Sequence, residues 1–178
     1  MAYHGQTALN LFADEINGEL RDRALRGAIE GKIRHFFDCV DKKNWPGVQE
    51  HLRPDVKLLL RLRGPGDIYR NQHYVVEQLK REVASGQTTV HKLLLVDRGR
   101  VTCYAATFWM ARVKAEQTPY FFESHQVFVI DLDDRHQIKR IDIRDNTDDV
   151  MQHDGDKDKM EIAIEETKTD AMHLIDRI

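Results

Sequence analysis

The fold of this chain is decided by the stretch Ile33–Trp45, IRHFFDCVDKKNW, and by Leu52–Val56, LRPDV, which closes it. Apolar residues recur at helical spacing through the first of these segments, which predicts an amphipathic helix over Asp22–Val40. A short helix is expected from Trp45 to Leu52, because Pro54 cannot continue inside a helix. The chain therefore enters its first strand from a pair of helices.

Further helical and extended patterns flank these two helices. Thr7–Ile16 predicts a short amphipathic helix before them. Asn71–Ala84 predicts another helix after them, ended by the serine and glycine that follow. Asp55–Leu62 is expected to be extended, and Gly64–Gly66, with the sequence GPG, to turn the chain. Most of the helical structure therefore precedes residue 88.

Strand patterns follow one another from Thr88 onward. Four segments rich in β-branched and aromatic residues predict an antiparallel meander: Thr89–Val96, Arg100–Val113, Tyr120–Leu132 and Gln137–Asp145. The second of these strands is apolar on both faces, so both faces of the sheet must be covered. We expect helices on the concave face and a second copy of the chain on the convex face, which predicts a homodimer.

Length, composition and charge exclude several classes of protein. The chain has 178 residues, a net charge of −3 and a pI near 6.3, so it lacks the basic surface that neutralises phosphates in nucleic acids. No segment reaches the roughly 20 apolar residues of a membrane span. Cys39 and Cys103 lie in apolar contexts, which suits a reducing compartment. We expect a cytoplasmic protein without a nucleic-acid or membrane partner.

The landmarks DKKNW at Asp41–Trp45 and RPDV at Arg53–Val56, with this order of elements, resemble the nuclear-transport-factor-two-like superfamily. The likeness is to its branch of SnoaL-like polyketide cyclases, scytalone dehydratases and ketosteroid isomerases. It implies an α+β fold, in which N-terminal helices wrap a cone-shaped, curved antiparallel sheet around a central pocket. Most enzymes of the superfamily need no cofactor, but it also includes domains without chemistry, so the fold does not decide the function.

The resemblance divides the chain into three parts. Residues 1–21 are expected to form an N-terminal helical extension, and residues 22–150 the SnoaL-like cone domain. Residues 151–178 are expected to form a polar linker and a C-terminal helix, because apolar residues recur from Met160 onward. The role of this last part stays open between a lid over the pocket, a dimer clasp and a disordered tail.

Arg34 and Glu123 are the strongest catalytic candidates from the residues themselves. Arg34 shares a helical stripe with Asp38 and Asp41 and, being always charged, can stabilise an oxyanion. The alternative for Arg34 is an exposed salt bridge to Asp38. Glu123 follows three aromatic residues, a setting that suits a general acid or base. The alternative for Glu123 is a cross-strand ion pair with a residue such as Arg112.

Asp41 and His91 form a second candidate pair, which the resemblance suggests. Asp41 matches the helix-borne aspartate of the scytalone dehydratases, and His91 matches the histidine that opens their first long strand. Histidine titrates near neutrality, so a copy that faces the pocket is a sensible acid–base group. The alternative is a strand histidine that is hydrogen-bonded to a neighbour.

The sequence predicts a cofactor-independent isomerase or cyclase that rearranges an apolar polycyclic secondary metabolite by a semipinacol- or ketol-type acid–base step. The predicted catalytic residues are Arg34, Glu123, Asp41 and His91. The predicted substrate-binding residues are Phe37, Asp38, Tyr104, Phe108 and His125. No metal is expected, because no spacing of the nine histidines matches a known metal motif. A dehydratase-like lyase and a non-catalytic small-molecule-binding or dimerisation domain remain alternatives.

Overall fold

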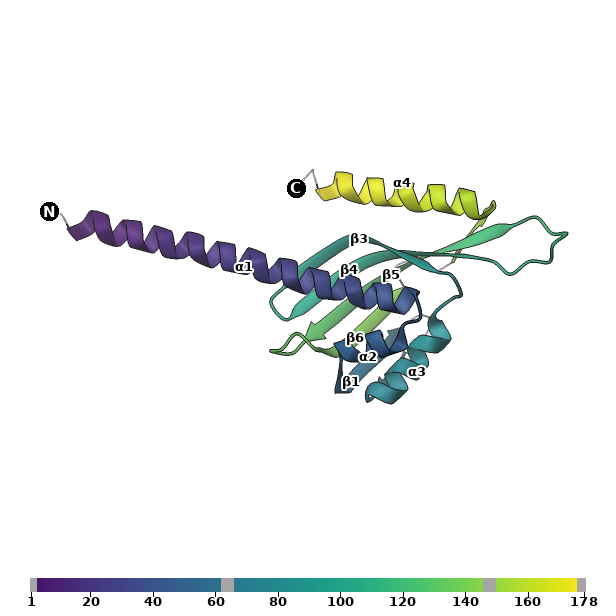
Figure 1. Cartoon of the computed structure of the whole chain (residues 1–178), viewed down its shortest axis with the longest axis horizontal. Helices are drawn as coiled ribbons and strands as arrows, with labels where there is room; N and C mark the ends of the chain where they lie inside the picture. Colours follow the sequence, from purple (N-terminus) through teal and green to yellow (C-terminus); the bar gives the residue numbers. More distant parts are fainter. Residues whose placement is uncertain (1–2, 62–65, 146–149, 176–178) are drawn as a thin grey trace.

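The computed structural model of the chain describes residues 3–61, 66–145 and 150–175, and within these ranges it contains four helices and seven strands (Figure 1). Their order along the chain is α1 (Tyr3–Asp41), α2 (Trp45–His51), β1 (Leu52–Arg61), β2 (Asp67–Arg70), α3 (Gln72–Glu82), β3 (Thr88–Asp97), β4 (Arg100–Met110), β5 (Tyr120–Leu132), β6 (Ile138–Asp145), β7 (Met151–Asp154) and α4 (Lys157–Ile175).

Helix α1 is continuous where the sequence analysis predicts two helices. It runs from Tyr3 to Asp41, and its N-terminal part projects well beyond the sheet (Figure 1). The predicted break before Asp22 is wrong, because no proline interrupts this segment and a lone Gly18 lowers helix stability by only about 1 kcal/mol. The C-terminal part of α1 is amphipathic as predicted, and Ile33 is among its buried residues. No helix in the described ranges is long and apolar enough to cross a membrane.

The two short helices begin at asparagine caps. The Asn44 side chain accepts a hydrogen bond from Gly47 N at 3.2 Å, and Pro46 occupies the first turn of α2. The Asn71 side chain accepts a bond of 3.2 Å from Tyr74 N at the start of α3. Both helices agree with the sequence prediction to within about two residues. The predicted turn at Gly64–Gly66 lies largely outside the described residues.

The strands form one curved, open sheet in the order β2-β1-β6-β5-β4-β3, with β7 paired to the first half of β5. The antiparallel meander from β3 to β6 is as predicted. Strand β1 adds to β6 in parallel. The four-residue strands β2 and β7 were not predicted, because each is too short to establish a periodic pattern.

The convex face of the sheet is covered in part by the chain's own C-terminal helix. Met160 and Ile164 of α4 pack against buried residues of β3, β4 and β5, including Phe108, which is fully buried. Helix α4 runs along β3 and β4 (Figure 1). The expectation that helices cover the concave face alone is therefore wrong, and a second copy on the rest of this face stays a prediction. The α4 residues up to Thr169 are absent from the lining of the cavity described below, and the role of the C-terminal part stays open.

Candidate active site

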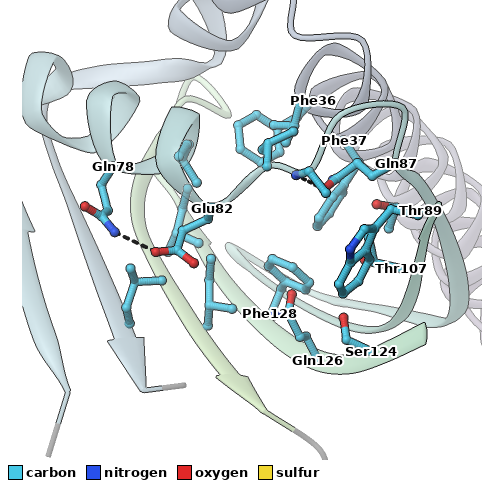
Figure 2. Close-up of a pocket in the computed structure, with 18 of the residues that line it drawn as sticks. Phe36, Phe37, Gln78, Glu82, Gln87, Thr89, Thr107, Ser124, Gln126 and Phe128 are labelled. Carbon is cyan, nitrogen blue, oxygen red and sulfur yellow. Dashed lines mark hydrogen bonds between the residues drawn. The ribbon is translucent and has the colours of Figure 1, made fainter. Parts of the chain in front are cut away.

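A cavity of about 570 Å³ lies between the concave face of the sheet and helices α1 and α3 (Figure 2). This volume is in the range of small-molecule sites. Its apolar lining includes Phe36, Phe37, Leu60, Trp109, Phe128 and Ile143. Its polar lining includes Gln78, Glu82, Gln87, Thr89, Thr107, Ser124 and Gln126. The site is therefore an aromatic and aliphatic chamber with a limited set of polar groups.

Three hydroxyl side chains form a row across the floor of the cavity. Thr89 of β3 is paired with Thr107 of β4, which is paired with Ser124 of β5. Directly paired residues on one face of a sheet have Cβ atoms about 5 Å apart. All three line the cavity. A hydroxyl both donates and accepts, so Thr107 and Ser124 can bind oxygen atoms of a ligand in either role, whereas the Thr89 hydroxyl donates to Asp41 and can only accept from a ligand.

The next row of the sheet places an amide beside the hydroxyls. Gln126 of β5 is paired with Ala105 of β4, and Ala105 is paired with His91 of β3. The small side chain of Ala105 leaves room above the sheet between the two larger ones. Figure 2 shows Thr107, Ser124 and Gln126 on one side of the cavity and Gln78 and Glu82 across the open space.

Helix α3 supplies a carboxylate to the cavity wall. Gln78 Nε2 donates a hydrogen bond of 2.7 Å to Glu82 Oε1, one helical turn away. Gln78 is buried, and its own amide oxygen accepts from Arg81 at 3.4 Å. The amide therefore has a fixed orientation and holds one oxygen of Glu82. The other carboxylate oxygen remains available to accept a proton from a ligand.

Asp41 lies behind the cavity and positions two residues that line it. Its carboxylate accepts hydrogen bonds from Gln87 Nε2 at 2.8 Å, Thr89 N at 2.7 Å and Thr89 Oγ1 at 2.8 Å. Burial raises the pKa of Asp41, and these three donors oppose that effect. Asp41 is not among the lining residues. The structure thus gives Asp41 an anchoring position between the end of α1 and the start of β3.

His91 is also placed one layer behind the cavity. Its Nδ1 lies 3.1 Å from Cys103 Sγ, and its ring packs edge-on against Phe37, which lines the cavity. Burial, followed by the charge of Arg34, lowers the pKa of His91 to about 4. Burial raises the pKa of Cys103 to about 12. At neutral pH both groups are uncharged, so they do not form a thiolate–imidazolium pair.

Arg34 and Asp38 face solvent rather than the cavity. Arg34 donates two hydrogen bonds to Glu30 Oε1, at 3.0 and 2.8 Å, and Asp38 pairs with Lys42 at 2.9 Å. The predicted pocket position of Arg34 is wrong, as is its predicted pairing with Asp38. The physical reason is helical phase, because Asp38 lies about 100° around α1 from the cavity-lining Phe37.

Glu123 points to the convex face of the sheet. Its neighbour Ser124 faces the cavity, and successive side chains of a strand point to opposite faces. Glu123 bonds instead to His125 Nε2, and its other oxygen lies 3.5 Å from His153 Nε2. The alternative, a cross-strand ion pair with a residue such as Arg112, is not observed, because the partners of Glu123 are His125 on the same strand and His153 on β7. The prediction that Glu123 faces the pocket is wrong.

The side chains of three predicted substrate-binding residues also point to the convex face of the sheet. His125 pairs with Glu123, Phe108 lies under α4, and Tyr104 is partly exposed. None of them lines the cavity. Their predicted positions are wrong, because β4 and β5 carry large side chains on both faces and the pattern does not distinguish the faces. Of the residues predicted to bind substrate, Phe37 is the one that lines the cavity.

The sequence analysis did not identify the polar groups that line the cavity. Gln78 and Glu82 are spaced four residues apart on α3 beside Leu79 and Val83, which also line the cavity. Polar residues on an apolar helical stripe are a usable signal. Ser124 lies between Glu123 and His125, the two β5 residues that the sequence analysis selected. The analysis therefore selected the correct strand but the side chains that point to its other face.

No protein-family model matches the sequence, and no curated protein matches it either. Several solved structures are similar in fold. An epoxide hydrolase/cyclase-like enzyme of pyran ring formation in the polyether salinomycin is 13% identical, with a TM-score of 0.58 over 70% of this chain and 95% of its own. A candidate ketosteroid isomerase from Kribbella flavida is 13% identical, with a TM-score of 0.52 over 67% of this chain and 78% of its own.

A third similar structure is a candidate polyketide cyclase from Xanthomonas campestris. It is 17% identical, with a TM-score of 0.51 over 66% of this chain and 90% of its own. Identities this low establish the fold alone. The chain therefore has the α+β cone fold of the nuclear-transport-factor-two-like proteins, which confirms the fold predicted from its sequence.

Proposed function

We propose that this protein is a cofactor-independent isomerase or cyclase that rearranges a small, apolar, ring-bearing metabolite in the cavity. The observation that carries the proposal is the position of Glu82, a carboxylate held by Gln78 on the wall of a largely apolar chamber. Across the chamber lie neutral donors that include Ser124 and Gln126 (Figure 2). This combination supplies a proton acceptor and a site for a developing oxyanion.

An acid–base rearrangement of an α-hydroxy ketone suits these groups. Glu82 takes the proton of the substrate hydroxyl, and the resulting alkoxide forms a new carbonyl as one carbon substituent migrates to the adjacent carbonyl carbon. The oxygen of the former carbonyl becomes the new alkoxide, which donors such as Ser124 stabilise. The proton then returns from Glu82 to that oxygen. The product is an isomer of the substrate, so the reaction consumes no co-reactant.

The aromatic lining supports an apolar, ring-bearing substrate. Phe37 and Phe128 pack edge-to-face, with ring centroids 4.8 Å apart, and both line the cavity. Trp109 lines another part of it and packs against Phe122. These fixed rings present flat apolar surfaces that match fused or substituted rings.

Replacement of Glu82 by glutamine tests this proposal. We expect Glu82→Gln to bind substrate within a few-fold of the wild type and to lose about 10²- to 10⁴-fold in turnover. Turnover is measured on a panel of apolar ring compounds with a hydroxyl beside a carbonyl, by the appearance of an isomer of equal mass. Glu77→Gln is the matched control, because Glu77 lies on the same helix and outside the cavity. An active Glu82→Gln variant contradicts the proposal.

A second candidate is a binding protein without chemistry. Most of the polar lining consists of neutral hydroxyl and amide groups, such as Thr89, Thr107 and Gln87, and such groups bind oxygen atoms without transferring protons. Trp109 lines the cavity, so its fluorescence reports occupancy once Trp45, the other tryptophan of the chain, is replaced by phenylalanine. Saturable binding with no isomer formed by any compound favours this candidate.

We also propose that the chain forms a homodimer through the part of the convex face that α4 leaves open. Leu95 and Tyr104 are 52% and 37% exposed there, and Leu93, Tyr104 and Val127 are neighbours across three strands. A second copy related by a two-fold axis would cover this apolar patch. Light scattering should give twice the 20.8 kDa mass of one chain.

Two variants test the proposed dimer, one in the apolar patch and one outside it. Tyr104→Arg should give a monomer, because it places a charge in the patch. Tyr74→Arg should leave the dimer intact, because Tyr74 is an exposed residue of α3. A wild-type protein that stays monomeric at high micromolar concentration contradicts the dimer and leaves the proposal for Glu82 unaffected.

A further inference from the structure

Three side chains with metal-binding atoms converge where the end of α1 packs against α2. His35 and Cys39 are one helical turn apart on α1, and His51 is the last residue of α2. His35 Nδ1 lies 2.8 Å from His51 Nε2 and 3.9 Å from Cys39 Sγ. One ligand atom from each residue can be chosen so that all three lie within 4.8 Å of one another. Within the described ranges, no other such group meets this condition.

These separations approach those around a tetrahedral zinc ion. Zinc–nitrogen bonds of about 2.0–2.1 Å and zinc–sulfur bonds of about 2.3 Å place two nitrogens about 3.4 Å apart and nitrogen and sulfur about 3.6 Å apart. The separation of 3.9 Å between His35 Nδ1 and Cys39 Sγ is about 0.3 Å longer than this value. The two imidazole nitrogens need to move apart by about half an ångström, which removes the hydrogen bond between them.

The start of α2 is built around the sulfur atom. A Cβ on Gly47 would lie 2.7 Å from Cys39 Sγ, so glycine at this position lets α2 approach the thiol. Asn44 Nδ2 lies 3.9 Å from the same sulfur, while the side-chain oxygen of Asn44 caps α2. Weak donors to a ligating sulfur are typical of the outer shell of metal sites.

The cluster is accessible and separate from the cavity. His35 is exposed, His51 is partly buried, and Cys39 is 2% exposed. An ion can therefore reach the imidazole nitrogens from solvent, with the sulfur beneath them. None of the three residues lines the cavity. The connection to the cavity is indirect, through Phe36, whose ring packs edge-on against His51 at 6.0 Å and which lines the cavity.

We propose that His35, Cys39 and His51 bind a zinc-type transition-metal ion, with water as the fourth ligand. Imidazole and thiolate ligands select zinc, copper or nickel over magnesium and calcium. Each histidine ligates through an unprotonated nitrogen and Cys39 as the thiolate, so binding releases the thiol proton to solvent. The sequence analysis predicts no metal because the spacing H-x₃-C-x₁₁-H matches no common motif. The third ligand comes from a separate helix that only the fold brings near.

The ion would tie the end of α1 to the end of α2. Since Phe36 lies between this cluster and the cavity, the ion also fixes one cavity wall. The site is therefore structural in character, and it stands or falls independently of the chemistry proposed for Glu82. Binding of an ion to the folded chain raises its stability by mass action. We expect a higher thermal midpoint in the presence of zinc.

Cobalt substitution tests the site directly. The full chain is freed of metal with a chelator and titrated with Co²⁺, whose thiolate bond gives a charge-transfer absorption and whose tetrahedral field gives intense visible bands. We expect one ion per chain, displaced by Zn²⁺. Cys39→Ser should abolish the charge-transfer band. His35→Ala, which replaces an exposed side chain, should weaken binding by at least about 100-fold.

Matched variants separate this site from adventitious binding. Cys103→Ser removes the other thiol of the chain, and His73→Ala removes an exposed histidine of α3. Both should bind cobalt as the wild type does, with circular dichroism confirming that every variant is folded. Two results overturn the proposal. They are a wild-type chain without the charge-transfer band, and a band that persists in Cys39→Ser.

Discussion

Gln78 donates a hydrogen bond of 2.7 Å to Glu82 from a side chain that is itself buried and lines the cavity. Because the amide of Gln78 is also held by Arg81, it gives the carboxylate a single orientation. The pair therefore fixes the direction in which the proposed base points.

Gln78→Met keeps the side-chain volume and removes this bond. We expect turnover to fall by about 10-fold, because the carboxylate then loses its fixed orientation. Steady-state kinetics measure this effect. Gln49→Met is the control, since Gln49 is an exposed residue of α2. Unchanged turnover in Gln78→Met means that Gln78 does not orient Glu82 for the reaction.

Thr107→Val tests the hydroxyl row. Valine has nearly the shape of threonine, so the stability of the fold should change by less than about 1 kcal/mol. The ligand loses one hydrogen-bond partner, and its dissociation constant should rise about 10-fold. Titration followed by Trp109 fluorescence measures the affinity, and urea unfolding measures the stability. Equal affinities for both proteins contradict a role for this hydroxyl in binding.

Asp41→Ala should destabilise the fold by about 1–3 kcal/mol, because it leaves Thr89 N–H and the Gln87 amide without their acceptor. Asp41→Asn keeps one carbonyl oxygen and should lose less. Urea unfolding at neutral pH compares the two variants. The variants would be more stable than the wild type only if burial of the Asp41 charge costs more free energy than its hydrogen bonds contribute.

The stability of the fold should decrease in acid because of His91. Burial lowers the pKa of His91 from 6.5 to about 4, so between these values the unfolded chain binds a proton that the folded chain excludes. Stability therefore rises with pH across this window and is lost as pH falls through it, by at most about 3 kcal/mol. The lowered pKa of His51 acts in the same direction, and the raised pKa of Asp41 opposes it.

Urea unfolding at several pH values between about 4 and 7 measures this dependence. His91→Gln should flatten the profile, because glutamine does not titrate in this range. His73→Gln should leave the slope unchanged, since His73 is exposed. A wild-type profile that is flat across the window contradicts the assignment.

The fold was predictable because its signals are local. Pro54 ends the helical region, and clear turns separate β3, β4, β5 and β6, so element order follows from the sequence. The continuity of α1 was not predictable from periodicity, because the apolar pattern weakens between Ile16 and Asp22 while nothing in the chain ends the helix there.

The residues that line the cavity were harder to predict because both faces of the sheet are partly buried. Glu123 and Ser124 differ by one position on β5, and the pattern of neighbouring aromatic residues fits either face. Helix α4 makes the convex phase partly apolar through Phe108 and Phe121, which removes the contrast between faces that a strand pattern depends on. Only the packing of α4 settles which phase faces the cavity.

The hydroxyl row has a consequence for the range of substrates. Neighbouring strands are about 4.8 Å apart, so the hydroxyls of Thr89, Thr107 and Ser124 repeat at about that interval. A rigid molecule whose oxygen atoms have the same spacing can engage two strands at once without losing internal freedom, whereas a flexible one loses entropy. Thr89 Oγ1 already donates to Asp41, so the Thr89–Thr107 pair offers one donor and the Thr107–Ser124 pair offers two. A rigid molecule that accepts hydrogen bonds through both oxygen atoms therefore fits one register of the row, the one between β4 and β5.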